Sequence, residues 1–341
     1  MKPSEMGVYL KFAITNREPV LVVGTPGIGK TDIIEQVCQD LKARLIVSHP
    51  VTSDPTDLKG IPALVTENGE QIAKFLPFND LYELVTAKEL TVFFLDDLGQ
   101  APQSVQAAAM QLFLARRING HILSDNVVIL AATNRREDQA GVQGILEPLK
   151  GRTTIIHLTP DEEDWFKWAR SKGLPEELIA FVNWRKYEGR SVLYEFKPSK
   201  DMSNSPTPRN IASCGIQMLK GLPKNLEFEV FMGRVGEGVA SEICHFLTIC
   251  RELPDPEWVI ANPEKAKIPT KPDIKFALIS SLIGRAKKEN FDNILKFANR
   301  LENEFSVLLV KDCVSKNPSL SDSSSALFTQ WCISHKDIIL L

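Results

Sequence analysis

The chain of 341 residues has few of the residues that build disulfide frameworks and metal clusters. It contains six cysteines, with no Cys-x-x-Cys pair among them, and five histidines that stand singly along the sequence. This pattern excludes a zinc-finger array and a small, disulfide-stapled secreted domain. We therefore expect the cysteines to be free thiols in a reducing compartment, buried for the most part.

An excess of charge of one sign is also missing. The 40 lysines and arginines face 43 aspartates and glutamates, so the formal net charge is only −3. Proteins that mainly grip nucleic acid usually carry a basic excess, and the balance here argues against nucleic acid as a partner. The apolar share of 43% is that of an ordinary globular chain and excludes disorder as the main state. The length predicts roughly two domains of about 150 residues each.

Long apolar runs are absent as well. No stretch approaches the roughly 18–20 apolar residues that a membrane-spanning helix needs. The first 19 residues lack the apolar core of a signal peptide. We therefore expect no membrane span and a cytoplasmic protein.

The first 160 residues do have alternating strand-like and helix-like segments. Helical spacing of apolar residues predicts helices over 31–43 and 104–116. Short apolar runs of the kind that is buried on both faces of a parallel sheet predict five strands, at 20–23, 44–48, 91–95, 127–132 and 153–158. This alternation indicates an α/β domain with a five-stranded parallel sheet and helices on both faces.

Two β-hairpins are predicted within this domain. An insert between the second and third strands, residues 54–77, carries Asn68-Gly69 between two strand-like runs, and Asn-Gly is the strongest short hairpin signal. A second hairpin is predicted over 117–123, with its turn at Asn119-Gly120.

After residue 160 the strand-like runs largely stop. The spacing predicts helices over 161–172, 176–186, 209–219 and 228–251. A loop rich in proline and serine is predicted at 197–208, and a proline-punctuated stretch at 253–272 precedes a last helical block over 273–336, with a small polar loop at 319–325.

The sequence GTPGIGKT, from Gly24 to Thr31, fits the pattern G-x-x-x-x-G-K-[ST] between a strand and a helix. That context favours a phosphate-binding loop, in which backbone N–H groups surround phosphates at a helix amino terminus. Lys30 would contact the β- and γ-phosphates and Thr31 would ligate Mg²⁺. The candidate nucleotide-binding residues are Gly24, Thr25, Pro26, Gly27, Ile28, Gly29, Lys30, Thr31 and Asp32.

Polar residues also follow the third and fourth predicted strands. Asp96 and Asp97 end the run FFLDD, where Asp96 can hold Mg²⁺ and Asp97 can orient and polarise the attacking water. Asn134 ends the run AATN, where it either contacts the attacking water or the γ-phosphate beside Asp97, or caps a loop.

Arginines supply the remaining candidates. Arg152, before the fifth strand, is either a finger that completes a neighbouring subunit's nucleotide site or a surface charge. Arg209 opens a helix after a loop and either reaches back to the phosphates or is a charge at the junction. Arg116 and Arg136 are further cations that could contact a neighbour's phosphates or Asp97.

These motifs, in this order, resemble those of the AAA+ ATPases, and within them of the MoxR-like group found in bacteria and phages. GTPGIGKT resembles the Walker A motif, LDD with the following GQA resembles Walker B, and AATN resembles sensor 1. EPLKGR resembles the arginine-finger segment and TPRN resembles sensor 2, while DPTDLKGIP resembles the start of the helix-2 insert of this group. LPDPEW and Ile268-Pro269 resemble the tail of its bacterial and phage-borne members.

The resemblance implies three parts and a mechanism. It implies a nucleotide-binding domain over 1–160 with an insert hairpin at about 58–77, a helical lid over 161–251, and a linker with a helical extension over 252–341. It further implies Mg²⁺-dependent ATP hydrolysis at the subunit boundaries of a hexameric ring, with Arg152 arriving from the neighbour and Arg209 coupling nucleotide state to the lid. The ring would remodel a client protein, in some relatives beside a partner with a von Willebrand factor A domain.

One departure from the family pattern leaves two alternatives open. The family usually has glutamate after the Walker B aspartate, whereas this chain has Asp97, whose side chain is shorter by one methylene. Misplacing a catalytic group by about an ångström can cost roughly 10²-fold in rate. An ATP-gated scaffold with little turnover is therefore one alternative to the active ATPase, and a DNA-acting AAA+ motor is the other.

Overall fold

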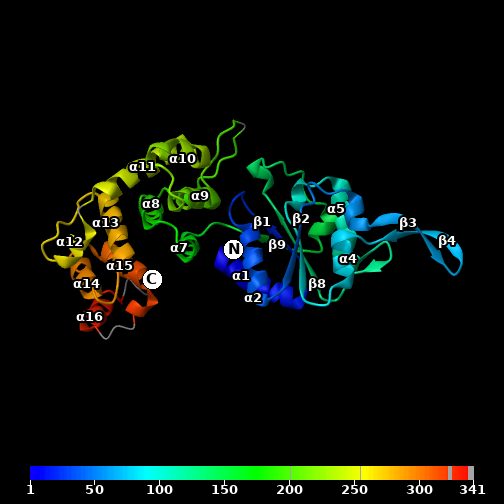
Figure 1. Cartoon of the computed structure of the whole chain (residues 1–341), viewed down its shortest axis with the longest axis horizontal. Coiled ribbons are helices and arrows are strands. Elements are labelled where there is room, and N and C mark those ends of the chain that lie inside the picture. Colours follow the sequence, from blue (N-terminus) through cyan, green and yellow to red (C-terminus); the bar gives the residue numbers. More distant parts are fainter. Residues whose placement is uncertain (200, 254, 322–324, 337–341) are drawn as a thin grey trace. The chain divides into compact units, whose positions relative to one another are not determined.

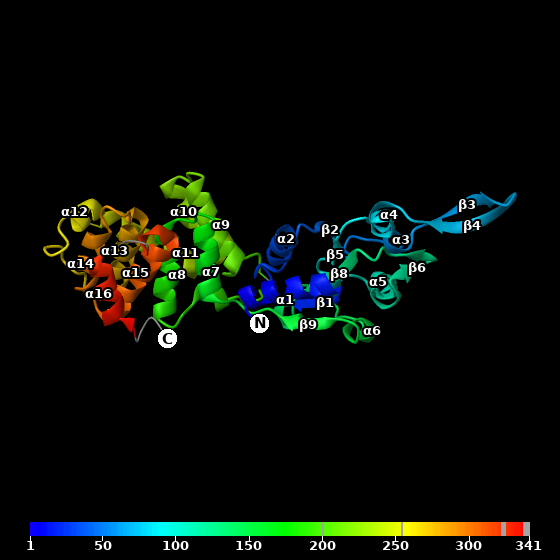
Figure 2. The same ribbon diagram turned by 90° about the horizontal axis from the view of Figure 1, so that it is seen from below.

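The computed structural model describes residues 1–199, 201–253, 255–321 and 325–336 of the chain. The chain divides into two compact units, one from Met1 to Asp161 and the other from Glu162 onward. Figures 1 and 2 show the elements of each unit from two sides. Separate clusters of buried apolar residues stabilise the two units, so each is described by itself.

The first unit is built on a parallel sheet with the strand order β2-β5-β8-β1-β9. Val23 pairs with Thr133 and Leu95 with Ala131, which brings the carboxyl ends of three strands to one edge of the sheet. The five predicted strands are confirmed, as β1 (Val20–Val23), β2 (Arg44–Ser48), β5 (Thr91–Leu95), β8 (Val127–Thr133) and β9 (Thr154–His157).

Helices cover both faces of this sheet because its central strands are apolar on both sides. Phe93 and Phe94 are adjacent on β5, point to opposite faces and are fully buried. Phe94 packs in a cluster with residues of α1 and α2, whereas Phe93 packs in a cluster with residues of α3, α4, α5 and α6. The bounds of these helices are α1 (Pro3–Asn16), α2 (Lys30–Leu41), α3 (Pro55–Lys59), α4 (Asn79–Thr86), α5 (Gln103–Ala115) and α6 (Glu147–Lys150), with 3-10 turns η1 (Leu98–Gln100) and η2 (Arg136–Asp138).

Helix α1 was not among the predicted elements, although it buries four residues completely. Its buried side chains follow helical spacing, whereas Val8 and Phe12 on the same helix are exposed and blur that spacing. The buried residues are Met6, Leu10, Ala13 and Ile14.

Both predicted hairpins are confirmed. Strands β3 (Ile61–Glu67) and β4 (Glu70–Leu76) are joined at Asn68-Gly69, and β6 (Arg117–Ile118) and β7 (His121–Ile122) at Asn119-Gly120. In each turn both central residues have positive φ, between 47° and 87°, as a type I′ turn requires.

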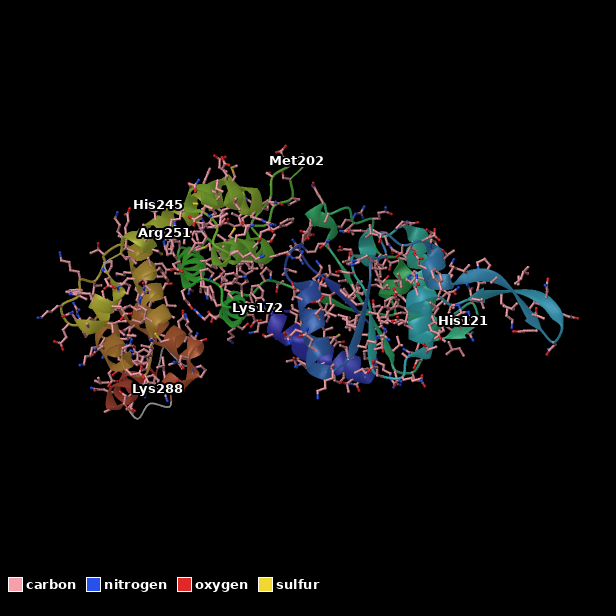
Figure 3. All side chains as sticks on the ribbon, viewed as in Figure 1. His121, Lys172, Met202, His245, Arg251 and Lys288 are labelled. Atoms are coloured by element: carbon pink, nitrogen blue, oxygen red, sulfur yellow. The ribbon has the colours of Figure 1, made fainter. Side chains whose placement is uncertain are left out.

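The two hairpins are joined at the base of the longer one, near His121 (Figure 3). His121 Nε2 donates a hydrogen bond to the Phe75 carbonyl at 2.7 Å, which fixes the ring tautomer. Asn119 Nδ2 donates to the Lys59 carbonyl at 2.8 Å. The short hairpin therefore holds the base of the β3–β4 hairpin from both ends.

The second unit is helical in its described residues and has one hydrophobic core. Phe181 of α8 meets Phe246 of α11 edge-to-face, with ring centroids 5.9 Å apart. The predicted division of this region at residues 251 and 252 stays a prediction, and the core takes residues from both sides of it. The helices are α7 (Glu162–Ser171), α8 (Glu176–Tyr187), α9 (Pro208–Leu219), α10 (Glu227–Val235), α11 (Glu237–Glu252), α12 (Pro256–Ala261), α13 (Pro272–Arg285), α14 (Phe291–Ala298), α15 (Asn303–Lys316) and α16 (Ala326–Ser334), with 3-10 turns η3 (Val192–Tyr194), η4 (Lys224–Leu226) and η5 (Pro318–Leu320).

The prediction of one helix over 228–251 is wrong. The chain forms two helices there, α10 and α11, separated by Gly236. Gly236 has φ 81° and ψ 162°, a region of backbone conformation that is essentially open to glycine alone. The break lets α10 and α11 pack against each other instead of running on as one rod.

Some of the predicted segments contain residues outside the described ranges. Residues 322–324 of the predicted polar loop, Lys200 of the predicted proline-rich loop, Pro254 of the tail motif and the last five residues, 337–341, lie outside the described residues. Within the described ranges, no helix is both long and apolar enough to cross a bilayer.

The six cysteines are free thiols, and three of them, Cys38, Cys214 and Cys313, are buried. Burial raises the pKa of Cys38 to about 11 and that of Cys214 to about 12, so both thiols stay protonated at neutral pH. The expectation of free thiols is therefore confirmed for all six residues, and that of burial for these three.

Candidate active site

The loop between β1 and α2 has the backbone conformation of a phosphate cradle. Gly27 has φ 70° and Gly29, the residue before α2, has φ 100°, both in the region that favours glycine. A Cβ on Gly24 would lie 3.3 Å from Ile28 Cγ2 and from Leu158 Cβ, tighter than side chains normally pack. Glycine at these positions lets the loop curl back over the amino end of the helix.

Lys30 is the cation of this loop, and its side chain is held in place by the loop itself. It is 7% exposed, and its Nζ donates to the carbonyls of Gly24 at 3.1 Å and Thr25 at 3.2 Å. The same Nζ donates to Asn134 Oδ1 at 2.6 Å, which joins the loop to the end of β8. The ammonium group is thus anchored beside the amino end of α2, where an anion would lie.

Thr31 and Asp96 form a second contact, between the first turn of α2 and the end of β5. Thr31 Oγ1, on the first turn of α2, donates to Asp96 Oδ2 at 2.8 Å. Asp96 follows β5 directly, and its backbone N–H donates to the Ser48 carbonyl at 2.9 Å. A hydroxyl and a carboxylate oxygen are therefore side by side at the carboxyl edge of the sheet. That these two residues hold Mg²⁺ stays a prediction.

Asp97 and Asn134 complete a chain of hydrogen bonds that begins at Lys30. Asn134 Nδ2 donates to Asp97 Oδ1 at 3.0 Å, while its Oδ1 accepts from Lys30. These two partners fix the orientation of the Asn134 amide, because an ammonium group only donates and a carboxylate only accepts. Asn134 is 7% exposed and is a bridge between the cation and the acid of the site rather than a loop cap.

The backbone at Asp97 gives a reason for aspartate in place of the family's glutamate. Asp97 has φ 56° and ψ 33°, the left-handed conformation, at the residue that precedes η1. Asparagine and aspartate adopt this conformation more readily than other residues with a side chain. The shorter acid therefore suits the turn that directs the chain from β5 towards α5.

Sequence reasoning missed the close contact between Gly99 and Thr133. A Cβ on Gly99 would lie 2.1 Å from Thr133 Oγ1 and 3.1 Å from Thr133 Cβ, so only glycine fits there. Thr133 is 3% exposed and immediately precedes Asn134. The contact holds the turn after Asp97 against the end of β8, and the pattern DDLGQ alone gave no sign of it.

The residues at this edge fit a nucleotide phosphate. Gly29, the residue that precedes α2, has no side chain that could cap the helix. The N–H groups of a helix's first turn point out of its amino end, which here faces the cradle. The fixed ammonium of Lys30 adds positive charge at the same place. Ile28 is buried beneath the loop, and Asp32 is exposed on the first turn of α2.

The same edge fits Mg²⁺, which takes oxygen ligands and is usually held by one or two carboxylates together with substrate phosphates. Thr31 Oγ1 and Asp96 Oδ2 supply two such oxygens. No group of three or more histidine, cysteine, aspartate or glutamate residues with the arrangement of a metal site occurs among the described residues. A metal here would therefore complete its shell from the substrate and from water.

Comparison with protein families identifies the class of this domain. Residues 20–160 match the model of the AAA family, described as "ATPase family associated with various cellular activities". These residues form an AAA ATPase domain. Its fold is the P-loop AAA+ fold that the sequence predicts, with the five-stranded parallel sheet between helices, and the rest of the described chain is helical.

Solved structures with partial likeness to the chain were also found. A RuvB mutant from Thermotoga maritima is 14% identical over 82% of this chain and 80% of its own, with a TM-score of 0.40. A putative ATPase from Cytophaga hutchinsonii is 14% identical over 91% and 80%, with a TM-score of 0.33. NtrX from Brucella abortus, in complex with ADP, is 11% identical over 98% and 68%, with a TM-score of 0.35. At such identities and TM-scores nothing about function follows from these likenesses, and the comparison with curated proteins gave no match.

Arg152 lies on the surface of the AAA domain between α6 and β9. Its side chain is exposed, and Nη1 donates to the Pro148 carbonyl at 2.9 Å. It forms no ion pair with another described residue, and it is not bonded to the residues around Lys30. A role in this chain's own nucleotide site therefore has no support, and a role towards a neighbour stays a prediction.

Of the other candidate arginines, Arg116 is bonded to the backbone of its own domain, whereas Arg136 and Arg209 are exposed. Arg116 donates to the carbonyls of Val127 at 2.9 Å and Ser124 at 2.7 Å, at the amino end of β8 and thus at the opposite end of that strand from Asn134. Its guanidinium is used to close the turn after α5. Arg136 is exposed in η2, and Arg209 is exposed on the first turn of α9 in the helical unit. The predicted contact of Arg209 with phosphates stays a prediction.

Proposed function

We propose that this chain is a MoxR-like AAA+ ATPase that hydrolyses Mg·ATP at the subunit boundaries of a homo-oligomeric ring, a hexamer by the family resemblance. The observation that carries the proposal is the hydrogen-bond chain from Lys30 through Asn134 to Asp97, beside the pair Thr31 and Asp96. Such a site places a cation, a metal-binding pair and an acid along one edge of the sheet. These are the groups that phosphoryl transfer to water needs.

Each group has a distinct role in this proposal. Lys30 and the N–H groups at the start of α2 bind the phosphates. Thr31 and Asp96 hold Mg²⁺, which neutralises charge that develops on the phosphate oxygens. Asp97 orients and polarises the attacking water. Asn134 keeps the carboxylate of Asp97 at a fixed distance from the ammonium of Lys30.

The exposure of Arg152 supports the proposed oligomer. Its guanidinium is exposed, and among the described residues its one hydrogen-bond partner is the Pro148 carbonyl of the preceding helix α6, so it can face a second subunit. An arginine supplied by a neighbour can stabilise the transition state by a factor of roughly 10³–10⁵. We further propose that the ring remodels a client protein, with a von Willebrand factor A domain protein as a candidate partner, and that Arg209 couples nucleotide state to the helical unit.

Mixing two inactive variants tests the subunit boundary. Arg152→Ala subunits retain an intact phosphate site, and Lys30→Ala subunits retain the arginine. If Arg152 acts on the neighbour, mixtures should recover part of the wild-type phosphate release, with a maximum near equal amounts. Failure to recover activity at any ratio, although the mixed subunits assemble together, would contradict the proposed role of Arg152.

The alternative of an ATP-gated scaffold rests on the short reach of Asp97. Asp97→Asn keeps the backbone preference of this left-handed position and removes only the negative charge. We expect it to bind a non-hydrolysable ATP analogue as wild type does and to release phosphate roughly 10²–10⁴-fold more slowly. If wild type at ring-forming concentrations releases phosphate no faster than Asp97→Asn, the scaffold is the correct reading.

A further inference from the structure

A buried glutamine on α5 is bonded to two segments of the AAA domain. One segment follows Asp97 and the other precedes Arg152. Gln106 is 1% exposed, on a helix whose other buried side chains are apolar. Its Nε2 donates to the Ala101 carbonyl at 3.1 Å and to the Gly144 carbonyl at 2.9 Å. Its Oε1 accepts from the Leu146 N–H at 3.1 Å. The amide thus connects the segment before α5 with the segment before α6.

Two further hydrogen bonds connect the same segments. Gln100 Nε2 donates to the Ala140 carbonyl at 2.7 Å, and the Gln143 N–H donates to the Gly99 carbonyl at 2.9 Å. Residues 140–146 are therefore held against residues 99–106 along their length. A polar side chain in an otherwise apolar interface costs free energy unless all its groups are bonded, and Gln106 meets that condition.

The segment that Gln106 holds leads directly to Arg152. Leu146 is the residue that precedes α6, and its carbonyl accepts from the N–H groups of Leu149 and Lys150. Leu149 is 1% exposed and packs in the same cluster as the apolar face of α5. Because Arg152 is bonded to the Pro148 carbonyl, its position follows that of α6.

The other end of the connection lies close in sequence to Asp97, the carboxylate to which the proposed function assigns the attacking water. Asp97 is the residue that precedes η1, and η1 is followed by Ala101 and then by α5. Gly99 lies against Thr133, next to Asn134. The bonds from Gln106 to Ala101 and to Leu146 therefore span from the turn after Asp97 to the start of α6, the helix that precedes Arg152.

We propose that Gln106 is a positioning residue for Arg152. It fixes α6 against α5, so that the arginine presented to a neighbouring subunit keeps a fixed position relative to the turn that follows Asp97 in the same subunit. The inference rests on the proposed function, in which Arg152 acts in trans. Gln106 touches no reacting group. It acts by limiting where α6 can lie.

Gln106→Met tests this role, because methionine has nearly the same length and removes all three hydrogen bonds. Gln111→Met is the matched control, since Gln111 is exposed on the same helix. We expect Gln106→Met to bind a non-hydrolysable ATP analogue as tightly as wild type and to release phosphate roughly 10–100-fold more slowly, because a displacement near 1 Å has that effect. The control should retain wild-type turnover.

Mixed oligomers decide where the loss arises. Gln106→Met subunits mixed with Lys30→Ala subunits should recover activity, because the intact phosphate site of the first receives the well-placed arginine of the second. Gln106→Met subunits mixed with Arg152→Ala subunits should not recover, because the only arginine present is misplaced. The opposite pattern would mean that Gln106 acts on its own nucleotide site, and it would overturn the proposal.

A milder variant covers the case in which Gln106→Met fails to assemble. Gln100→Met removes one bond of the same connection, so it should show a smaller loss of turnover with the same mixing pattern. Wild-type turnover in either variant overturns the inference. The separate mixture of Arg152→Ala with Lys30→Ala distinguishes the two levels, since its failure would reject the trans arginine itself, whereas its success with the opposite Gln106 pattern rejects only Gln106.

Discussion

At the scale of single residues, hydrogen bonds restrict the polar side chains of the candidate site to one arrangement. Lys30, Asn134 and Asp97 form a linear chain in which the middle amide has one donor and one acceptor partner. All three lie at the carboxyl edge of the sheet, where strand order places them together. A change at Asn134 should therefore alter catalysis more than binding.

Asn134→Ala removes both of these bonds and leaves the contacts of Lys30 with its own loop. We expect kcat to fall roughly 10–100-fold while the affinity for an ATP analogue changes little, because the bridge orients the acid and not the phosphate cradle. Asn126→Ala is the control, since Asn126 precedes the other end of the same strand and donates to the Ala87 carbonyl. Equal losses of kcat in both variants would count against a catalytic bridge.

At the scale of elements, glycine decides where helices end and where strands may approach. Gly99 permits the contact with Thr133, and Gly236 permits the break between α10 and α11. The two cases differ in kind. The first depends on space around the residue, whereas the second depends mainly on a backbone conformation that other residues avoid.

Gly236, which follows α10, and Gly233, which lies inside it, give a matched test of this difference. Gly236→Ala forces a side chain into φ 81° and places its Cβ 3.0 Å from the Asn204 carbonyl oxygen, so we expect a loss of about 1–3 kcal/mol in the free energy of unfolding. Gly233→Ala lies inside α10 with no atom near its Cβ, and it should gain about 0.5–1 kcal/mol. Denaturant unfolding followed by circular dichroism measures both. Equal effects would mean that the conformation at Gly236 carries no strain for alanine.

At the scale of the whole molecule, the two units have separate cores, and the core of the helical unit has a titratable ion pair beside it. In the helical unit, Asp312 of α15 is bonded to Arg170 of α7, with Nη2 and Oδ2 2.6 Å apart. Burial raises the pKa of Asp312 from 3.8 to about 6, against the opposing effect of the Arg170 charge. The folded state therefore holds this proton more tightly than the unfolded state does.

This raised pKa fixes the sign of a pH effect on stability. Between about pH 4 and pH 6 the folded state binds more protons at Asp312, so the contribution of this group to the free energy of unfolding falls as pH rises, by on the order of 3 kcal/mol. Asp312→Asn should remove that slope, and above about pH 6 it also lowers stability because Arg170 loses its charged partner. Unfolding midpoints at pH 4, 5, 6 and 7 test this, with exposed Asp201→Asn as the control. An unchanged slope in Asp312→Asn would refute it.

The α/β class, the five strands, both hairpins and the phosphate loop were predictable from the amino-acid sequence, because these features depend on local patterns. Apolar runs predict buried strands, Asn-Gly predicts a tight turn, and GTPGIGKT between strand and helix predicts a cradle. The helix break at Gly236 was missed because helical spacing continues on both sides of it. Helix α1 was missed because two exposed apolar side chains blur its pattern.

Which polar side chains form hydrogen bonds with one another depends on the folded structure and was not predictable from the sequence. Asn134 lies 104 residues from Lys30 and 37 from Asp97, and no local pattern encodes that its amide bridges them. The same holds for Gln106, whose partners Gly144 and Leu146 are 38 and 40 residues away. Strand order and helix packing bring such residues within hydrogen-bond distance, and these depend on the burial of apolar side chains from the whole AAA domain.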